Sequence, residues 1–183
     1  MVKKKTCVFI SGQGSNLNNL ISRSRDNNFP IKISLIISSN KNAKGISYAK
    51  KYKIPYFFID TKIRNYEKII LYNLKKYKIS FICLAGYMKI ISNYLIKNYQ
   101  NKIINVHPSL LPKFKGLNTF SRMLKKDEIK AGCTVHYVNK KLDSGNTIVQ
   151  KFFYINNRDN ENTLKEKTQK LEYKAFPEAI IKI

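Results

Sequence analysis

Apolar runs and amphipathic segments alternate along the first part of the chain. Runs of β-branched and aromatic residues predict strands, because such side chains suit a pleated, largely buried surface. These runs span residues 5–12, 31–39, 54–60, 79–88 and 101–108. Apolar residues spaced three and four apart predict helices between them. The helical segments span residues 15–25, 43–53 and 63–78. This βα alternation predicts βαβ units around a parallel sheet.

Two of these helices carry more specific expectations. Ser15 or Asn16 is expected to cap the first helix through its side chain. In the third helix, one apolar side is expected to face the core. Its members are Tyr66, Ile69, Ile70, Leu74 and Tyr77.

The pattern changes after residue 130. Residues 131–139 and 147–155 read as strands, and the turn between them leaves no room for a crossover helix, so they should pair antiparallel. Residues 162–183 read as a helix interrupted around Pro177. The chain shows no repeat or linker. We therefore predict a single α/β domain over residues 1–183, with an open, twisted, mostly parallel sheet, helices on both faces and an antiparallel C-terminal strand pair.

Lysine dominates a strongly basic composition. The 183 residues carry a formal net charge of +24, and 30 of the 35 basic residues are lysine. A net charge of this size is typical of nucleic-acid-binding proteins. However, the lysines are spread over nearly every segment and the five arginines form no patch, whereas readers of base edges rely on arginine. We interpret the charge mainly as a consequence of codon composition and predict no specific nucleic-acid partner.

The cysteines and the apolar runs bear on the compartment. Cys7, Cys83 and Cys133 lie far apart in apolar strands, without a CxxC pair or a cysteine–histidine cluster. This favours buried, reduced thiols and no metal site. No apolar run approaches the roughly 18 residues that cross a bilayer. We expect a cytoplasmic protein that does not bind membranes.

The turn after the first strand, Ser11 to Leu17, has the composition of an anion site. Exposed backbone N–H groups at a helix start attract negative charge, and glycine lets a phosphate approach the backbone closely. The motif lacks the third glycine of a dinucleotide fingerprint and the Gly-Lys-Ser/Thr ending of a P-loop. A phosphomonoester site and an ordinary strand-to-helix turn both remain open.

One of only two histidines occupies the end of the strand at residues 101–108. Asn105 and His107 are two positions apart, so their side chains point to the same side of the sheet. Pro108 restricts His107 to an extended backbone. An amide donor beside an imidazole can stabilise an oxyanion and transfer a proton. A histidine that only caps a loop is the alternative.

Two more residues are weaker candidates. Asp143 lies in a turn, where a carboxylate could pair with an imidazole and raise its pKa; aspartate is also common in turns for its local hydrogen bonds. His136 lies within an alternating strand, and we expect it to have a packing role.

These stretches together resemble the phosphoribosylglycinamide formyltransferases, folate-dependent enzymes of purine synthesis with a Rossmann-like fold. The resemblance rests on "VFISGQGSNL", "LAGYMKII", "NVHPSLLPKFKGLNT", "VHYVNKKLDSG" and "TQKLEYKAFP", which together cover most of the chain. It implies transfer of the formyl group of 10-formyltetrahydrofolate to the amine of a glycinamide ribonucleotide, without a metal.

The resemblance also implies roles for individual residues. Asn105, His107 and Asp143 would be catalytic: Asn105 and a protonated His107 would stabilise the oxyanion, and Asp143 would keep His107 protonated. The substrate's phosphate would bind Gly14, Ser15 and Asn16, and Glu172 would meet its ribose hydroxyls or nearby polar atoms. The folate would be bordered by Arg64, Met88, Lys89, Ile90, Ile91 and Asn105.

The sequence departs from the family pattern after the histidine turn. Relatives usually have Pro-Gly-Leu-His-Thr-His, and this chain has "KGLNTF", with Lys115, Asn118 and Phe120 at the replaced positions. Lys89 stands where arginine is usual. We expect these changes to spare the catalytic residues but to affect the rigidity of the loop and some substrate contacts.

Alternative functions are other folate-dependent formyl transfer or hydrolysis, a decayed inactive relative, and a lysine-rich nucleic-acid-binding module without catalysis. Methionyl-tRNA formyltransferase and formyltetrahydrofolate deformylase each carry a further domain, for which we see no room. Small molecules are the expected partners, and we expect a monomer or a weak homodimer.

Overall fold

The computed structural model describes residues 2–183, which form two compact units that divide between Ile104 and Asn105. The strands belong to one seven-stranded sheet, in the order β3-β2-β1-β4-β5-β6-β7. The bounds and pairings given below confirm an α/β fold with a mostly parallel sheet. The prediction of a single domain over residues 1–183 stays a prediction.

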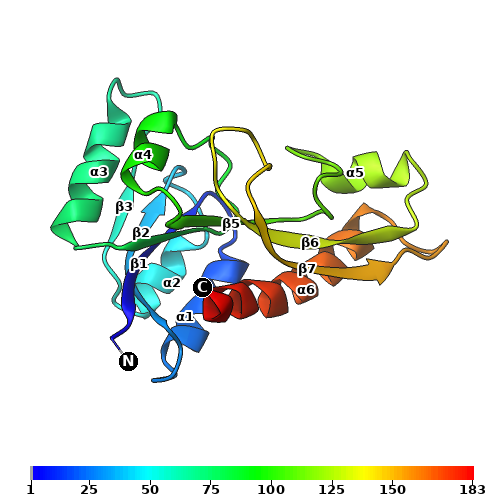
Figure 1. Cartoon of the computed structure of the whole chain (residues 1–183), viewed down its shortest axis with the longest axis horizontal. Helices are drawn as coiled ribbons and strands as arrows, with labels where there is room; N and C mark the ends of the chain where they lie inside the picture. The colour runs from blue at the N-terminus through cyan, green and yellow to red at the C-terminus, as the bar shows by residue number, and fades with distance from the viewer. Residues whose placement is uncertain (1) are drawn as a thin grey trace. The chain divides into compact units, whose positions relative to one another are not determined.

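The first unit alternates strands and helices (Figure 1). Its elements are β1 (Lys4–Ile10), α1 (Ser15–Ser24), β2 (Ile31–Ser38), α2 (Ile46–Lys51), β3 (Tyr56–Phe58), α3 (Tyr66–Lys76), β4 (Phe81–Leu84) and α4 (Asn93–Asn98). β1 pairs in parallel with β2 and β4, and β2 pairs in parallel with β3. β1 and β4 are buried almost throughout, as expected for parallel strands that are covered on both faces.

The second unit begins inside β5 (Ile103–His107) and continues with α5 (Thr119–Leu124), β6 (Lys130–Tyr137), β7 (Thr147–Tyr154) and α6 (Glu161–Lys182). β6 and β7 pair antiparallel from Lys130 opposite Tyr154 to His136 opposite Thr147, which confirms the predicted strand pair. A small core lies under the loop that precedes α5. It consists of Phe114, Met123, Ala131 and Leu164, with Phe120 packed against them.

Several local predictions were wrong. The N-cap of α1 is Gly14 in the left-handed region, with no side-chain cap from Ser15 or Asn16, because the chain must turn sharply out of β1. In α3, Leu71 is buried whereas Ile69 is 43% exposed. The periodicity of the sequence did not reveal the six-residue helices α4 and α5.

The C-terminal helix is not interrupted at Pro177. α6 continues through this proline to Lys182. Ala175, Phe176, Ala179 and Ile180 around it are buried, and the burial of each large apolar side chain contributes roughly 1.5–3 kcal/mol. This packing offsets the helix hydrogen bond that proline cannot donate.

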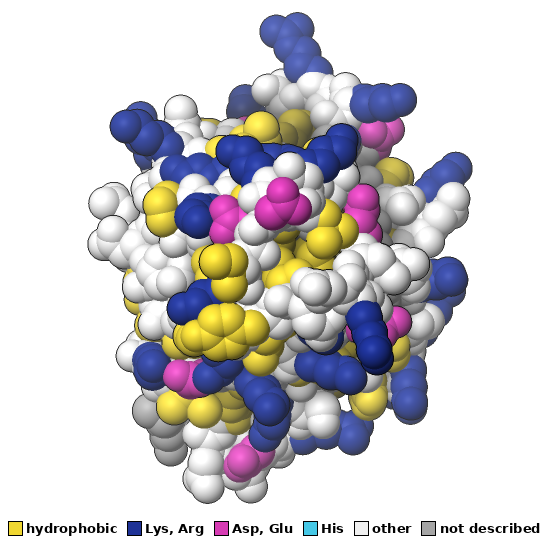
Figure 2. All heavy atoms as spheres, turned by 90° about the vertical axis from the view of Figure 1, so that its right-hand side faces the viewer, with side chains coloured by type: hydrophobic (Ala, Val, Ile, Leu, Met, Phe, Trp, Pro, Cys, Tyr) yellow, Lys and Arg dark blue, Asp and Glu magenta, His cyan; other side chains and the backbone are white. Residues whose placement is uncertain are grey.

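The basic side chains are dispersed on one face of the molecule. On the face shown in Figure 2, lysine and arginine side chains are scattered between polar and apolar ones and do not merge into a single patch. This agrees with the even spread of lysine along the sequence. Among residues 2–183, no helix combines the length and the apolar character that a membrane span requires.

Candidate active site

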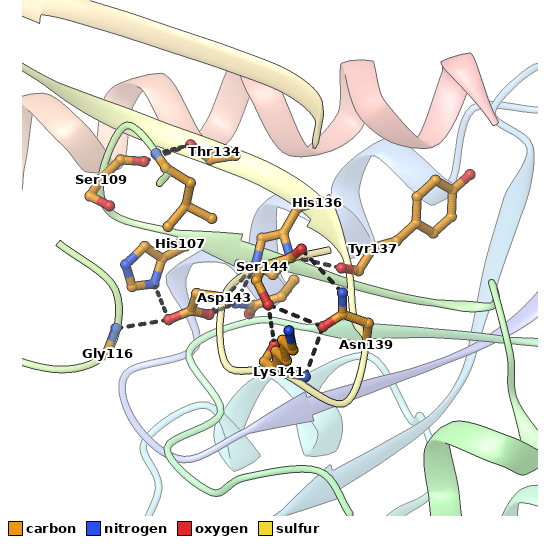
Figure 3. Close-up of polar contacts among 12 residues, drawn as sticks. His107, Ser109, Gly116, Thr134, His136, Tyr137, Asn139, Lys141, Asp143 and Ser144 are labelled. Carbon is orange, nitrogen blue, oxygen red and sulfur yellow. Dashed lines mark hydrogen bonds and ion pairs between the residues drawn. The ribbon is translucent and has the colours of Figure 1, made fainter. Parts of the chain in front are cut away.

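Asp143 is the centre of a polar cluster in the second unit. Its Oδ2 lies 3.3 Å from His107 Nδ1, and its Oδ1 accepts a hydrogen bond from Asn105 Nδ2 at 3.5 Å. His107 comes from the end of β5, whereas Asp143 comes from the loop between β6 and β7 (Figure 3). Asn105 lies two residues before His107 on β5. The structure therefore brings together the three side chains that the family resemblance implied to be catalytic.

The cluster is shielded from water and its backbone is specialised. The side chains of His107 and Asp143 are 6% and 8% exposed. Asp143 has a positive φ of 44°, a left-handed conformation that aspartate tolerates better than most residues. This backbone allows the carboxylate to accept a hydrogen bond from the Gly116 backbone N–H at 2.9 Å. The carboxylate is therefore fixed from two sides.

His136 is a further member of the cluster. The sequence did not predict this position for its side chain. Its Nε2 lies 3.3 Å from Asn105 Nδ2 and 3.6 Å from Asp143 Oδ1. Its Nδ1 donates to the Tyr137 carbonyl at 2.8 Å, because a carbonyl oxygen can only accept. In the neutral ring, Nε2 is then the acceptor, which orients the amide group of Asn105 toward it. The buried strand position that we expected for His136 is correct, but the residue also positions Asn105.

The pKa values of His107 and Asp143 are set by competing effects. Burial lowers the pKa of His107 and outweighs the Phe114 carbonyl and Asp143, which raise it. For Asp143, burial raises the pKa, but the neighbouring His136 ring, the Gly116 N–H and the His107 imidazole lower it below its usual value. Asp143 is thus ionised at neutral pH. Asp143 raises the pKa of His107, as expected, but burial lowers that pKa by more.

The two ring nitrogens of His107 have distinct roles. Nε2 lies 2.9 Å from the Phe114 carbonyl and must donate to it, so in the neutral ring the lone pair is on Nδ1 and faces Asp143. A proton that arrives on Nδ1 is at once hydrogen-bonded by an ionised carboxylate. The arrangement is that of a general base whose protonated form is stabilised by its neighbour.

The turn after His107 is fixed to the strands β6 and β7. Thr134 Oγ1 donates to the Ser109 carbonyl at 2.7 Å and accepts from the Leu111 N–H at 3.0 Å. Gln150 Nε2 donates both to the Leu111 carbonyl and to Thr134 Oγ1, each at 2.8 Å. These bonds hold the Pro-Ser-Leu-Leu-Pro turn in place and with it the end of β5.

The pH dependence of stability offers a test of the buried imidazole. The folded pKa of His107 is below its ordinary value of 6.5, so below pH 6.5 the unfolded chain binds this proton more readily and stability falls as the pH falls. Between about pH 7.5 and about pH 5, we expect the free energy of unfolding in urea to fall less for His107→Gln than for the unmodified chain. Asp143 does not obscure this test, since its lowered pKa acts below 3.8. Equal losses would contradict the burial argument.

The predicted anion site is in the first unit. Gly14 has a φ of 76° and immediately precedes α1, whose first turn carries no acidic residue. Its neighbour is Gly45 at the start of α2, and the Gly45 N–H donates to the Gly12 carbonyl at 3.0 Å. A β-carbon on Gly14 would lie 2.5 Å from the Gly45 Cα. The turn is therefore compact, with its backbone at the positive end of a helix.

Gly14→Ala should disturb this turn, and Gly12→Ala should not. The clash with Gly45 and the positive φ should together lower the free energy of unfolding by about 1–3 kcal/mol. A β-carbon on Gly12 meets nothing within 4 Å, so its effect should stay within about 0.5 kcal/mol. Urea unfolding of both variants is the measurement. Equal stabilities of the two variants would show that the close approach of Gly14 to Gly45 does not constrain the turn.

The loop predicted to border a folate is tied to the anion turn. Ser11 Oγ accepts from the Met88 N–H at 2.8 Å and contacts Ser39 Oγ at 2.7 Å. One serine thus links the loops that follow β1, β2 and β4. Met88 and Ile90 are 64% and 76% exposed, which leaves apolar surface for a planar ring. Lys89 is also exposed and Ile91 is half-buried.

The two remaining predicted residues lie on separate elements. Arg64 is exposed in the turn before α3. Glu172 is half-buried on α6, and its charge adds to the burial that raises the pKa of Cys133 to about 12. Residues 2–183 contain no group of three or more histidine, cysteine, aspartate or glutamate side chains that could hold a metal ion.

Comparison with known proteins places the chain in a family. A family model described as formyl transferase matches residues 4–180. The phosphoribosylglycinamide formyltransferase of Bacillus subtilis (strain 168) is 36% identical over 181 residues, which cover 97% of this chain and 93% of that protein. The trifunctional purine biosynthetic protein adenosine-3 of Homo sapiens is 35% identical over 182 residues, but the match covers only 18% of its length.

Solved structures agree with the sequence relatives. The crystal structure of phosphoribosylglycinamide formyltransferase from Bacillus halodurans has a TM-score of 0.94 at 32% identity and covers 98% of this chain and 94% of that one. The enzyme of the same name from Brucella melitensis has a TM-score of 0.93 at 35% identity, with coverages of 99% and 95%. The chain therefore belongs to the formyl transferase family and, within it, to the phosphoribosylglycinamide formyltransferases.

Proposed function

We propose that the chain transfers the formyl group of 10-formyltetrahydrofolate to the amine of N1-(5-phosphoribosyl)glycinamide in purine biosynthesis. The observation that carries the proposal is the buried pairing of ionised Asp143 with His107 beside Asn105. It occurs in a chain that is at least 30% identical, over nearly its whole length, to relatives named for this activity.

The cluster supplies each group that amine formylation requires. Asn105 donates a hydrogen bond to the oxyanion that forms on the formyl oxygen; its present contacts, at 3.3 and 3.5 Å, are long and are easily exchanged for a charged acceptor. His107 takes the proton that the attacking amine loses as its new bond to the formyl carbon forms. It then gives this proton to N10 as the bond from that carbon to N10 breaks.

Asp143 acts on the imidazole in this scheme. Because burial keeps the pKa of His107 low, His107 begins as the free base and becomes positively charged only during the reaction. The carboxylate, 3.3 Å from Nδ1, stabilises that charge at the moment it forms. This revises the sequence-based expectation that Asp143 holds His107 protonated beforehand.

Other predicted residues are proposed to bind the two substrates. The N–H groups at Gly14, Ser15 and Asn16 suit the phosphate, since they open a helix that has no acidic residue in its first turn. Glu172 is proposed to accept hydrogen bonds from the ribose hydroxyls.

The folate is proposed to lie against the Met88–Ile91 loop and Arg64. The exposed apolar side chains of Met88 and Ile90 fit the flat ring system, and Arg64 and Lys89 fit its acidic end. Asn105 would also contact the formyl-bearing part of the donor. We further propose that the enzyme works in the cytoplasm, in line with its three free cysteines, and that it is a monomer or weak homodimer.

The test is a transfer assay with the unmodified protein. 10-Formyltetrahydrofolate is mixed with N1-(5-phosphoribosyl)glycinamide, and loss of the formyl group is followed by absorbance while the formylated product is measured separately. We expect product in equal amount to the donor consumed. Donor loss without the ribonucleotide would instead support a hydrolase, and formylation of methionyl-tRNA would support a different acceptor. No formyl loss under any condition would overturn the proposal.

A further inference from the structure

Residues 113–117 supply contacts to both members of the His107–Asp143 pair; we call this segment the pairing loop. The Phe114 carbonyl accepts from His107 Nε2 at 2.9 Å, and the Gly116 N–H donates to Asp143 Oδ2 at 2.9 Å. The spatial relation of imidazole and carboxylate thus depends on the conformation of one short loop.

The pairing loop has a backbone that needs external support. Phe114 has a φ of 55° and Gly116 a φ of 77°. The left-handed region costs a non-glycine residue such as Phe114 roughly 1–2 kcal/mol. The usual proline of the family is replaced here by Lys115, so the loop also lacks the rigidity that a fixed φ would provide.

Arg122 on α5 contacts this loop at three points. Its Nη1 donates to the Lys115 carbonyl at 2.7 Å and to the Leu117 carbonyl at 3.2 Å, on either side of Gly116. Its guanidinium carbon lies 5.5 Å from the centroid of the Phe114 ring, within the range of a cation–π contact. One side chain thus contacts the ring of Phe114 and the two residues that flank Gly116.

We propose that Arg122 is a positioning residue for formyl transfer. It holds the pairing loop so that Phe114 and Gly116 keep the His107 imidazole and the Asp143 carboxylate in contact. This inference rests on the proposed function. Arg122 does not touch the reacting groups; it acts through the loop.

The charge of Arg122 gives the role a second signature. The groups that act on His107 are Asp143, which favours its charged form, and His136 and Arg122, which disfavour it, in addition to burial and the Phe114 carbonyl. Removing the positive charge of Arg122 should therefore raise the pKa of His107. The chain has only two histidines, so the two imidazoles can be titrated separately by NMR.

The experiment compares Arg122→Gln, Arg122→Lys and Arg158→Gln in the full chain. Arg158→Gln removes the same charge from an exposed turn and should behave like the unmodified enzyme. We expect Arg122→Gln to lower kcat by about 10- to 100-fold, with little change in KM, because a small displacement of catalytic groups has effects of this size. Arg122→Lys should restore part of kcat and keep the His107 pKa low, since it keeps the charge.

The outcomes separate the inference from the function on which it rests. If the unmodified enzyme is inactive, the proposed function is wrong. If it is active and Arg122→Gln has the same kcat as Arg158→Gln, only the inference about Arg122 is wrong. Equal kcat losses in Arg122→Gln and Arg122→Lys would also contradict it, because the lysine keeps the charge and a donor for the loop carbonyls. The titration needs no turnover and reports separately on the charge of Arg122.

Discussion

His107→Ala should lower kcat for formyl transfer by about 10²–10⁴-fold, which is the range expected when a general acid–base group is removed. The imidazole of His107 can both take the amine proton and release it, and the Asp143 carboxylate lies 3.3 Å from its Nδ1. The buried carboxylate of Asp143, which remains in the variant, would then be ionised without its partner. Steady-state kinetics with both substrates saturating measures this kcat.

Loss of folding would also lower the rate of His107→Ala. A second variant, His107→Gln, separates this explanation from loss of proton transfer. His107 is 5% exposed, so its truncation leaves a cavity and an uncompensated charge. His107→Gln fills most of the volume and still offers an amide to the Phe114 carbonyl, but it cannot carry the proton. We expect both variants to be slow. A His107→Gln enzyme with kcat near that of the unmodified chain would show that His107 has no proton-transfer role.

Asp143→Asn should lower kcat by about 10²–10³-fold while the fold is kept. The amide can still accept from the Gly116 N–H through its carbonyl oxygen, but it cannot stabilise the imidazolium that forms on His107. Since the carboxylate raises the pKa of His107, its neutralisation should also lower that pKa further. The rate of the variant should therefore depend less on pH near neutrality, as a kcat–pH profile would show.

Asp159→Asn is the matched control for this change. The Asp159 side chain is also nearly buried in the second unit and has a lowered pKa. However, it accepts hydrogen bonds from the Asn156 N–H at 3.0 Å and, from α6, from Thr163 Oγ1 at 2.9 Å and Lys167 Nζ at 2.7 Å. Its neutralisation should reduce stability and leave kcat per folded molecule unchanged. Equal kcat losses in the two variants would indicate a general effect of removing a buried charge and not a catalytic one.

The sequence was informative where a physical pattern is local. Period-two and continuous apolar runs located the strands, because burial on one or both faces dictates them directly. The Asn-x-His spacing with a following proline placed Asn105 and His107 on one side of β5, because alternation and the restriction of the residue before proline are properties of adjacent residues. The departures at Lys115 and Phe120 were also visible in the sequence alone.

What the sequence could not reveal depends on contacts between distant segments. His136 occupies a buried position of β6, and only the register of that strand shows that its ring meets Asn105. Pro177 predicts a helix break locally, but the packing of α6 overrides it. Arg122 is one of five scattered arginines in the sequence, and its role is visible only once α5, which the periodicity did not reveal, places it against the pairing loop.

The dependence of catalysis on the coupling between His107 and Asp143 is tested most directly by a double-mutant cycle. kcat/KM for formyl transfer is measured for the unmodified enzyme, His107→Gln, Asp143→Asn and the double variant under the same conditions. If the imidazole and the carboxylate act as one proton-transferring unit, the double variant should be little slower than the slower single variant. A double variant whose loss equals the product of the two single losses would mean that the two side chains act independently, and the proposed mechanism would be wrong.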